Sequence, residues 1–458
     1  MITLAAVAVY AGLMMWLIVR RRFLFYLLTL TLVPISVRLA SVVYVDLLGP
    51  VYSDQLFRDV GPGSAAPPLV LAFVFYLVPF LIAFRLRRAT QLARRAREAA
   101  DEGPTTADAT VATAVFIAFA IFVILLFADL VRIGVVPFFA GIERYEYTTQ
   151  YGGIWHAALM KYGALLAFFL GLFYSIGVLL RGRPDERFLF LLISLFVYLF
   201  LAGHRFSAFF THSAAFLIPY GAVTLVGQRG ESRRADPSSR FVRARSLILV
   251  ATVCLGGTAL VGAAVYNSYF NTRDTGEGSP LEALAHRTLV QPGELWYATW
   301  ERAFISRSNR PAEAFDRVFV HPVTDPGLNS SIPYLMIAEV GDRAYPTLEQ
   351  GSAYGGGFPE IFFELCGPLL AYPVLFVTGS LTAWLWLVLV RAILERRYVR
   401  VALCWYVLFA LVLISLGGML NFLVNWKFWA KVAALAGWVL FERERERLVR
   451  APPEEVRA

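Results

Sequence analysis

Long apolar runs dominate the pattern of hydrophobic and polar positions along the chain. A helix rises about 1.5 Å per residue and a bilayer core is about 30 Å thick, so runs of about 17–25 apolar residues predict spanning helices. The runs are continuous rather than alternating, which favours helices over strands because each backbone amide must be satisfied within its own segment. About eleven runs are long enough or nearly so: residues 2–19, 23–43, 68–84, 110–131, 154–180, 188–202, 214–227, 246–265, 360–390, 401–420 and 426–441.

These runs divide the chain into three parts. Residues 1–265 predict an N-terminal bundle of about eight helices, and residues 359–458 predict about three more helices followed by a basic tail. Residues 266–358 form a polar insert between them. The expected fold is therefore an all-α polytopic membrane protein with about eleven transmembrane helices and one large extracytoplasmic helical loop.

The polar insert carries its own helix signals. Residues 279–282 (Ser-Pro-Leu-Glu) form a capping box with proline at the first helical position, which predicts a helix over about 280–290. A second helix is expected over about 294–308, with Trp296, Trp300 and Phe304 on one face, and a short third one over 311–319. After Pro322 the pattern becomes irregular, and the Gly- and Tyr-rich stretch 342–359 is typical of a binding lid.

Composition and charge support a membrane protein and give it a direction. With 58% hydrophobic and 16% charged residues, the chain has too little polar surface for a soluble domain of its length. Most of its basic residues lie on short alternate connections, which predicts a multi-pass membrane protein with an extracytoplasmic N-terminus and a cytoplasmic C-terminus. That asymmetry explains the net charge of +9 without a nucleic-acid partner. The three cysteines fall in apolar runs, so no disulfide is expected in the loops.

The stretch 203–213 is the most unusual of the predicted extracytoplasmic loops. It contains His204, Arg205 and His212 and lies between two apolar runs that are too short to cross a standard bilayer. An arginine near membrane depth is costly unless it faces water, a partner or an anion, so Arg205 and His204 are candidate functional residues. The alternative is that Arg205 extends to the membrane surface.

Two further arginines lie among tyrosines. Arg144 is flanked by Tyr145 and Tyr147, and Arg343 is close to Tyr345. A guanidinium group binds phosphate in a bidentate manner, and aromatic faces stack on pyranose rings, so such a cluster suits both a phosphate and a sugar. Arg144 could instead pair with the glutamates beside it.

Other polar and aromatic residues have open roles. Trp296, Trp300 and Tyr354 are either packed within the insert or platforms for a glycan. Glu360 opens the ninth apolar run, where a carboxylate interacts favourably with the helix dipole, but it could also act as a base, as could His321. Arg38 and Asp129 interrupt two apolar runs. An ion pair between them, or extension of each side chain to the membrane surface, is the favoured explanation, and a role in a polar cavity is the alternative.

Taken together, the layout resembles the bacterial O-antigen or oligosaccharide repeat-unit polymerases (Wzy-like). The shared features are many spans, two arginine-bearing outer loops, a large late outer loop, and Gly-Ser-Ala-Tyr-Gly-Gly-Gly-Phe-Pro-Glu (351–360) leading into the next helix. The resemblance covers most of the chain in layout, and residues 143–155, 203–213 and 342–367 in motif.

This resemblance implies a metal-independent, inverting glycosyltransferase of the C superclass that needs no cofactor. Its partners would be undecaprenyl-pyrophosphate-linked oligosaccharide and membrane lipid, with a chain-length-regulating co-polymerase as a further candidate. Arg205, Arg144 and Arg343 would neutralise the departing pyrophosphate. His204, Glu360 or His321 would take the proton from the acceptor hydroxyl. The protein would lie in the bacterial inner membrane, with its N-terminus and its active site on the periplasmic side. The glycan would contact Tyr145, Tyr147, Trp296, Trp300, Tyr345 and Tyr354.

Three other functions remain open on the sequence. An O-antigen ligase uses the same lipid-linked donor and this general architecture. A metal-dependent polyprenyl-phosphate sugar transferase would use acidic residues in the first outer loop, where Asp46, Asp54 and Asp59 lie without forming a tight pair. A flippase or transporter of lipid-linked oligosaccharide would instead show broken helices and polarity at mid-depth. The chain contains no HExxH, paired CxxC, P-loop or GxSxG motif.

Overall fold

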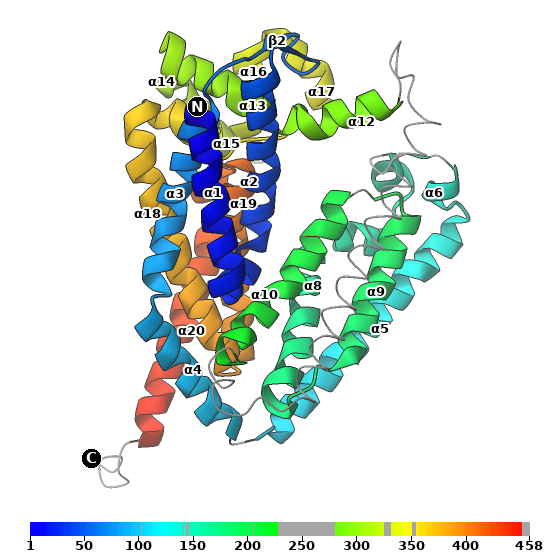
Figure 1. The fold of residues 1–458 in the computed structure, drawn as a ribbon. Helices are drawn as coiled ribbons and strands as arrows, with labels where there is room; N and C mark the ends of the chain where they lie inside the picture. Colours follow the sequence, from blue (N-terminus) through cyan, green and yellow to red (C-terminus); the bar gives the residue numbers. More distant parts are fainter. Residues whose placement is uncertain are drawn as a thin grey trace. The chain divides into compact units, whose positions relative to one another are not determined.

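The computed structural model describes residues 1–101, 103–140, 142, 146–204, 206–227, 280–324, 331–349 and 354–450. This part of the chain is almost entirely helical (Figure 1). Eight of its helices are long and apolar enough to cross a membrane. The expected class, an all-α membrane protein, is confirmed at this level.

The chain forms two compact units, and the boundary between them falls inside α1 (Ile2–Arg20), α2 (Arg22–Leu48) and α4 (Leu86–Asp101). Unit 1 comprises residues 1–10, 34–88 and 289–458. Its other long helices are α3 (Ala66–Ala83), α18 (Glu360–Leu394), α19 (Tyr398–Gly417) and α20 (Trp426–Arg450). A short 3-10 helix, η5 (Leu420–Val424), precedes α20.

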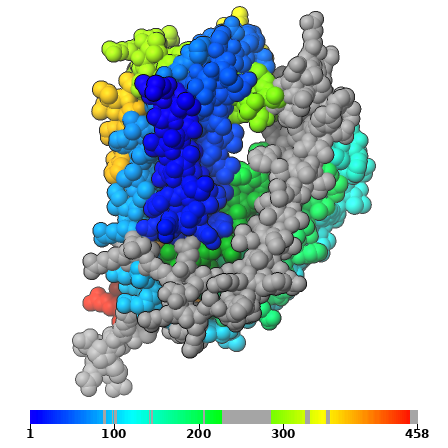
Figure 2. All heavy atoms as spheres, viewed as in Figure 1, coloured from blue at the N-terminus to red at the C-terminus, as the bar shows by residue number. Residues whose placement is uncertain are grey.

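Packing in unit 1 centres on α18, which lies against α3 and α19. The contact with α3 is close because Gly379 has no side chain. A Cβ atom there would lie 2.3 Å from the carbonyl oxygen of Tyr76, so only glycine allows the two backbones to approach in this way. By contrast, α1 is peripheral and exposes most of its apolar side chains, as the dark blue helix at the front of Figure 2 shows.

Unit 2 comprises residues 11–33 and 89–288. Its described elements are α4 (Leu86–Asp101, shared with unit 1), α5 (Thr106–Ile133), α6 (Pro137–Ala140), the π-helix η1 (Tyr147–Tyr151), α8 (Ile154–Arg181), α9 (Glu186–Leu201), α10 (Phe206–Gly227) and α12 (Pro280–Leu289). A capping box starts α5, where the Thr105 side chain accepts from the backbone N–H of Asp108, and Gly134 ends it at φ 72°.

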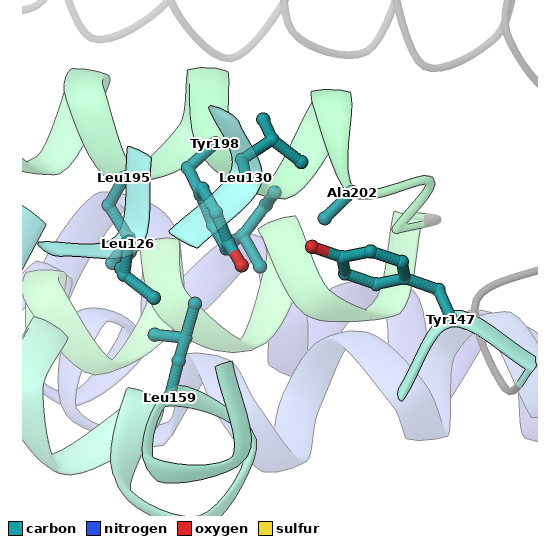
Figure 3. Packing of buried hydrophobic residues seen from close by; sticks show 8 residues of the cluster. Leu126, Leu130, Tyr147, Leu159, Leu195, Tyr198 and Ala202 are labelled. Carbon is teal, nitrogen blue, oxygen red and sulfur yellow. The ribbon is translucent and has the colours of Figure 1, made fainter. Parts of the chain in front are cut away.

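A buried cluster from α5, η1, α8 and α9 forms the core at one end of unit 2 (Figure 3). Leucines from α5 and α9 pack around Tyr198, and Tyr147 from η1 points its hydroxyl toward the hydroxyl of Tyr198. Elsewhere α8 and α10 approach closely at Gly171, where a Cβ would lie 2.0 Å from the carbonyl oxygen of Phe216. Apolar burial and small residues therefore hold this bundle together.

The described part of the polar insert forms a helical module, which comprises α13 (Gln291–Trp300), η2 (Glu301–Ser306), α14 (Pro311–Phe315), η3 (Asp316–Val320), α15 (His321–Thr324), α16 (Ser331–Val340), η4 (Gly341–Ala344) and α17 (Tyr345–Glu349). The predicted helices over 280–290, 294–308 and 311–319 are confirmed to within a few residues. The expectation of irregular structure after Pro322 is wrong for residues 331–349, which are helical.

Three predicted spans differ from the candidate spans in the structure. The run 188–202 becomes α9, whose 16 residues are few for a full crossing. The run 426–441 lies in α20, whose second half is highly charged, and the run 246–265 lies outside the described residues. The predicted loop 203–213 is mostly helical, because α10 begins at Phe206 and includes His212. The first two turns of α10 contain polar residues, so the hydropathy pattern alone does not show where this helix begins.

Two irregular features lie next to the helical module in unit 1. A short hairpin, β1 (Val51–Ser53) paired with β2 (Arg58–Val60), follows α2 and lies at the same end of that helix as α13 and α16 (Figure 1). In addition, α18 is interrupted at Gly367, where φ is 72° and ψ is 175°, and Pro368 follows directly. The short first segment of α18 therefore has its own direction.

Candidate functional site

The helical module is fixed to the α2–α3 connection by one buried carboxylate. Asp46, near the end of α2, accepts hydrogen bonds from Thr3 Oγ1 at 3.1 Å, from the backbone N–H groups of Ala65 and Ala66 at 3.0 Å each, and from Tyr297 Oη at 2.9 Å. Ala65 and Ala66 begin α3, and the N-terminus of a helix favours a negative charge. All the strong acceptor directions of Asp46 are therefore used within the protein.

Two neighbouring aromatic residues of α13 complete this contact. The Trp296 indole N–H donates to the carbonyl oxygen of Ala65 at 2.8 Å, and its ring meets Phe363 of α18 edge-on at 5.2 Å. Burial, together with the charge of Asp46, raises the pKa of the Tyr297 hydroxyl. This tyrosine therefore acts as a neutral donor to Asp46.

A second anchor is a buried group of one cation and two carboxylates. Arg302 of η2 donates from Nη2 to Glu364 Oε1 at 2.7 Å and from Nε to the same oxygen at 3.0 Å. Its Nη1 also pairs with Glu339 of α16. The Glu364 and Glu339 side chains are only 1% and 7% exposed, so Arg302 joins η2, α16 and α18 through charges that are shielded from water.

A third buried pair joins α2 to α18. Arg38 Nη1 lies 3.2 Å from Glu360 Oε2 and also donates to the carbonyl oxygen of Phe358. The predicted pairing of Arg38 with Asp129 is wrong, because Arg38 pairs with Glu360 and Asp129 pairs with Arg132 at 2.9 Å. The partner of Arg38 is Glu360, which is 322 residues away, so no local sequence pattern connects the two.

An open pocket lies beside the Arg302 group. It has a volume of about 490 Å³ and is lined by Trp300, Glu301, Arg302, Ile305 and Ser306 of the module, with Arg58 of β2 on its rim. Arg58 Nη2 lies 2.5 Å from Glu301 Oε2, and both side chains are partly exposed. The pocket therefore combines one aromatic wall with paired charges and a hydroxyl group.

The β1–β2 hairpin is tied to the module at two further points. The Arg343 guanidinium lies over the ring of Phe57, at 5.2 Å from its centroid, and remains exposed. The Tyr354 hydroxyl donates to the carbonyl oxygen of Gln55 at 2.8 Å. Burial raises the pKa of Tyr354, so its hydroxyl stays protonated as the donor of this bond.

Unit 2 contains a separate buried polar cluster. His156 of α8 has no exposed surface, and its ring nitrogens lie 2.9 Å from Tyr198 Oη and 3.1 Å from Thr148 Oγ1. Two predicted site residues surround it, since the ring centroids of Tyr147 and His204 lie 4.9 Å and 5.5 Å from that of His156. Nothing in the local sequence singles out His156, because the apolar pattern around it is that of an ordinary span.

The predicted site residues thus fall into several groups. Arg205, Arg144 and Tyr145 lie outside the described residues. His204 and Tyr147 lie in unit 2, while Glu360, His321, Arg343, Tyr345, Trp296, Trp300 and Tyr354 lie in unit 1. Of the unit 1 set, only Trp300 lines the pocket. Glu360 and Trp296 are enclosed in packing contacts, His321 is half-buried at the start of α15, and Tyr345 is exposed.

The organising roles of Arg302, Asp46 and Glu364 were not predicted from the sequence. Nothing in the sequence around Arg302 shows that Glu339 and Glu364 fold against it. In the part of the chain that the structure describes, no group of three or more His, Cys, Asp or Glu side chains is arranged to hold a metal ion.

Comparison with known proteins gives one partial match. Residues 325–430 match a family of unknown function (DUF6418), which covers less than a quarter of the chain. The matched segment contains Glu339, Glu360 and Glu364, whereas their partners Arg38 and Arg302 lie outside it. No curated protein and no solved structure matches the chain.

Proposed function

We propose that the chain is a membrane-embedded glycosyltransferase that polymerises undecaprenyl-pyrophosphate-linked oligosaccharide repeat units. It would work at the outer face of a bacterial inner membrane, by inverting transfer without a metal. The observation that carries this proposal is the helical module, which buried hydrogen bonds and an ion pair fix to the ends of α2, α3 and α18. A rigid polar module on membrane-length helices suits a substrate with a lipid tail and a polar head.

The residues take the following roles in this proposal. Arg205, Arg144 and Arg343 neutralise the pyrophosphate as it departs. Among these, Arg343 is exposed on Phe57 and is available to an anion. The acceptor proton goes to His204 or His321, since Glu360 has no exposed surface and is paired with Arg38. The proposed topology has about eleven spans, with the N-terminus in the periplasm and the C-terminus in the cytoplasm.

One observation favours a second candidate function, a flippase or transporter of the same lipid-linked oligosaccharide. The break of α18 at Gly367 is the kind of discontinuous helix that transporters use. Against this reading, the first segment of α18 carries Glu360 and Glu364, and both are held by arginines within unit 1. An O-antigen ligase would share the donor, and no contact described above separates it from a polymerase.

The decisive experiment uses the purified full chain with short lipid-linked repeat units in proteoliposomes. Polymerisation gives a ladder of longer glycans, which gel electrophoresis and mass spectrometry resolve. Unchanged oligomers with altered sidedness would instead identify a flippase. Transfer to lipid A core sugar, when this acceptor is supplied, would identify a ligase.

Arg205→Ala is expected to abolish chain extension while the protein still reaches the membrane, because the leaving pyrophosphate loses its main counter-charge. Near-normal long-chain glycan in this variant would remove Arg205 from the proposal. Addition of EDTA is expected to leave the ladder unchanged. Loss of activity in the chelator would favour the metal-dependent transferase instead.

A further inference from the structure

The pocket beside η2 has a lining that indicates what it binds. Its volume of about 490 Å³ lies in the range of small-molecule sites and is large enough for one or two sugar rings. Two of its lining residues are arginines, Arg58 and Arg302, which on their own would suggest an anionic ligand. The partners of these arginines decide against an anion.

Both guanidinium groups are already neutralised within the protein. Arg58 lies 2.5 Å from Glu301, which lines the same pocket. Arg302 is held by two carboxylates, Glu339 and Glu364, so that group carries one more negative charge than positive. A diphosphate entering the pocket would have to displace these carboxylates or approach them closely, and like charges at short range are unfavourable. The lining therefore favours an uncharged polar ligand.

Trp300 gives the pocket a firm aromatic wall. Its ring is half-buried and meets Tyr297 nearly edge-on, at 5.4 Å between centroids. A Cβ atom at Gly63 would approach Trp300 Cη2 to 3.0 Å, so the backbone at this glycine packs closely against the edge of the ring. A ring that is held in place loses little conformational entropy when a ligand stacks on it.

We propose that this pocket binds one or two uncharged sugar residues of a glycan. The apolar C–H face of a pyranose would stack on Trp300. Its hydroxyl groups would exchange hydrogen bonds with the exposed Arg58–Glu301 pair, which offers donors and acceptors side by side. If the proposed function holds, this glycan is the acceptor repeat unit, and only this assignment rests on the proposed function. Glycan binding itself requires no catalysis.

Binding can be measured with the detergent-purified full chain, labelled with a fluorophore, on a printed array of neutral and acidic bacterial surface oligosaccharides. The wild type is expected to bind a subset of neutral glycans. Trp300→Ala should weaken that binding about tenfold or more, as for other aromatic anchors at the centre of a site. Trp426→Ala is the matched control, because Trp426 is a 72% exposed tryptophan of the same unit on α20.

Two additional variants keep the test decisive if Trp300→Ala folds poorly. Trp300→Phe keeps an aromatic face and should bind within a few-fold of the wild type. Arg58→Ala removes a partly exposed rim residue and should weaken binding without loss of the folded protein. No bound glycan, or binding that both alanine variants retain, would overturn the proposal.

Inorganic pyrophosphate serves as the competing probe. If it bound to the wild type and lost affinity in Trp300→Ala, the pocket would be an anion site and the inference would be wrong. The two proposals also fail separately. Glycan binding without a ladder of longer glycans would support the binding pocket and contradict the polymerase function. A ladder without Trp300-dependent glycan binding would support the polymerase function and contradict the binding pocket.

Discussion

Arg302 offers the sharpest test of how the helical module is held. Replacement by methionine keeps a long apolar stem but removes the only cation that contacts Glu339 and Glu364 among the described residues. Both carboxylates would then be buried without a counter-charge. Breaking a buried ion pair by removing one partner costs about 3–5 kcal/mol, because the remaining charge stays desolvated.

This cost translates into a measurable change in thermal stability. For a domain of 150–250 residues, each 1 kcal/mol shifts the melting temperature by about 2–4 °C, so Arg302→Met should lower it by roughly 6–20 °C. The assay measures the apparent melting temperature of the detergent-purified full chain. Samples are heated at one fixed rate, and unfolding is detected as the loss of the monodisperse elution peak. Arg310→Met is the matched control. Arg310 pairs with Glu313 at the surface, where side-chain exposures are 75% and 44%, so its loss should cost under about 1 kcal/mol.

A compensated variant separates the buried charge from simple loss of packing. Arg302→Met combined with Glu339→Gln and Glu364→Gln leaves no unpaired ion, so it should recover a large part of the lost stability. A melting temperature of Arg302→Met within about 2 °C of the wild type would be close to that of the control and smaller than the shift expected from a broken buried pair. That result would show that Arg302 does not neutralise buried carboxylates. The same conclusion would follow if the compensated variant were less stable than Arg302→Met alone.

Two further predictions concern unit 2. Gly153→Ala should destabilise the protein by about 1–3 kcal/mol or more, because the new Cβ would lie 1.8 Å from Asp129 Oδ2; Gly12→Ala in α1 meets nothing within 4 Å and should be neutral or slightly stabilising in the same melting assay. Hydrogen bonds from Arg187 and Arg181 hold the pKa of Asp185 below the usual value of about 4 for an aspartate, so this carboxylate contributes stability above about pH 4 that is lost as the pH falls through its folded-state pKa. Asp185→Asn should therefore lower the melting temperature at pH 7, and the gap to the wild type should close below about pH 4; a gap that stayed constant with pH would contradict this assignment.

The helices could be predicted well from the sequence because their signals are local. Apolar length located most spans, and the proline at position 280 located the start of α12. Capping and breaker residues act within one or two turns, so a linear pattern contains them. The start of α10 was missed for the same reason, since Ser207, Thr211 and His212 interrupt the apolar pattern inside a regular helix.

The contacts that organise the candidate site could not be predicted in this way. Arg38 and Glu360 are 322 residues apart, and Tyr297 and Asp46 are 251 apart. Each such residue looks like an ordinary helix end or solvated face until its partner folds against it. Trp300 was named as a glycan platform, but its role as the wall of a pocket depends on Arg58 and Gly63, which lie in a different part of the sequence.

The break at Gly367 has a mechanical consequence for α18. A continuous helix transmits tilt along its length like a rod, whereas a helix that is interrupted by a non-helical residue does not. The seven residues from Glu360 to Cys366 are anchored by Arg38 and Arg302, so they move with the helical module. The longer segment after Pro368 can change its tilt as the thickness of the surrounding bilayer changes, without tilting the helical module.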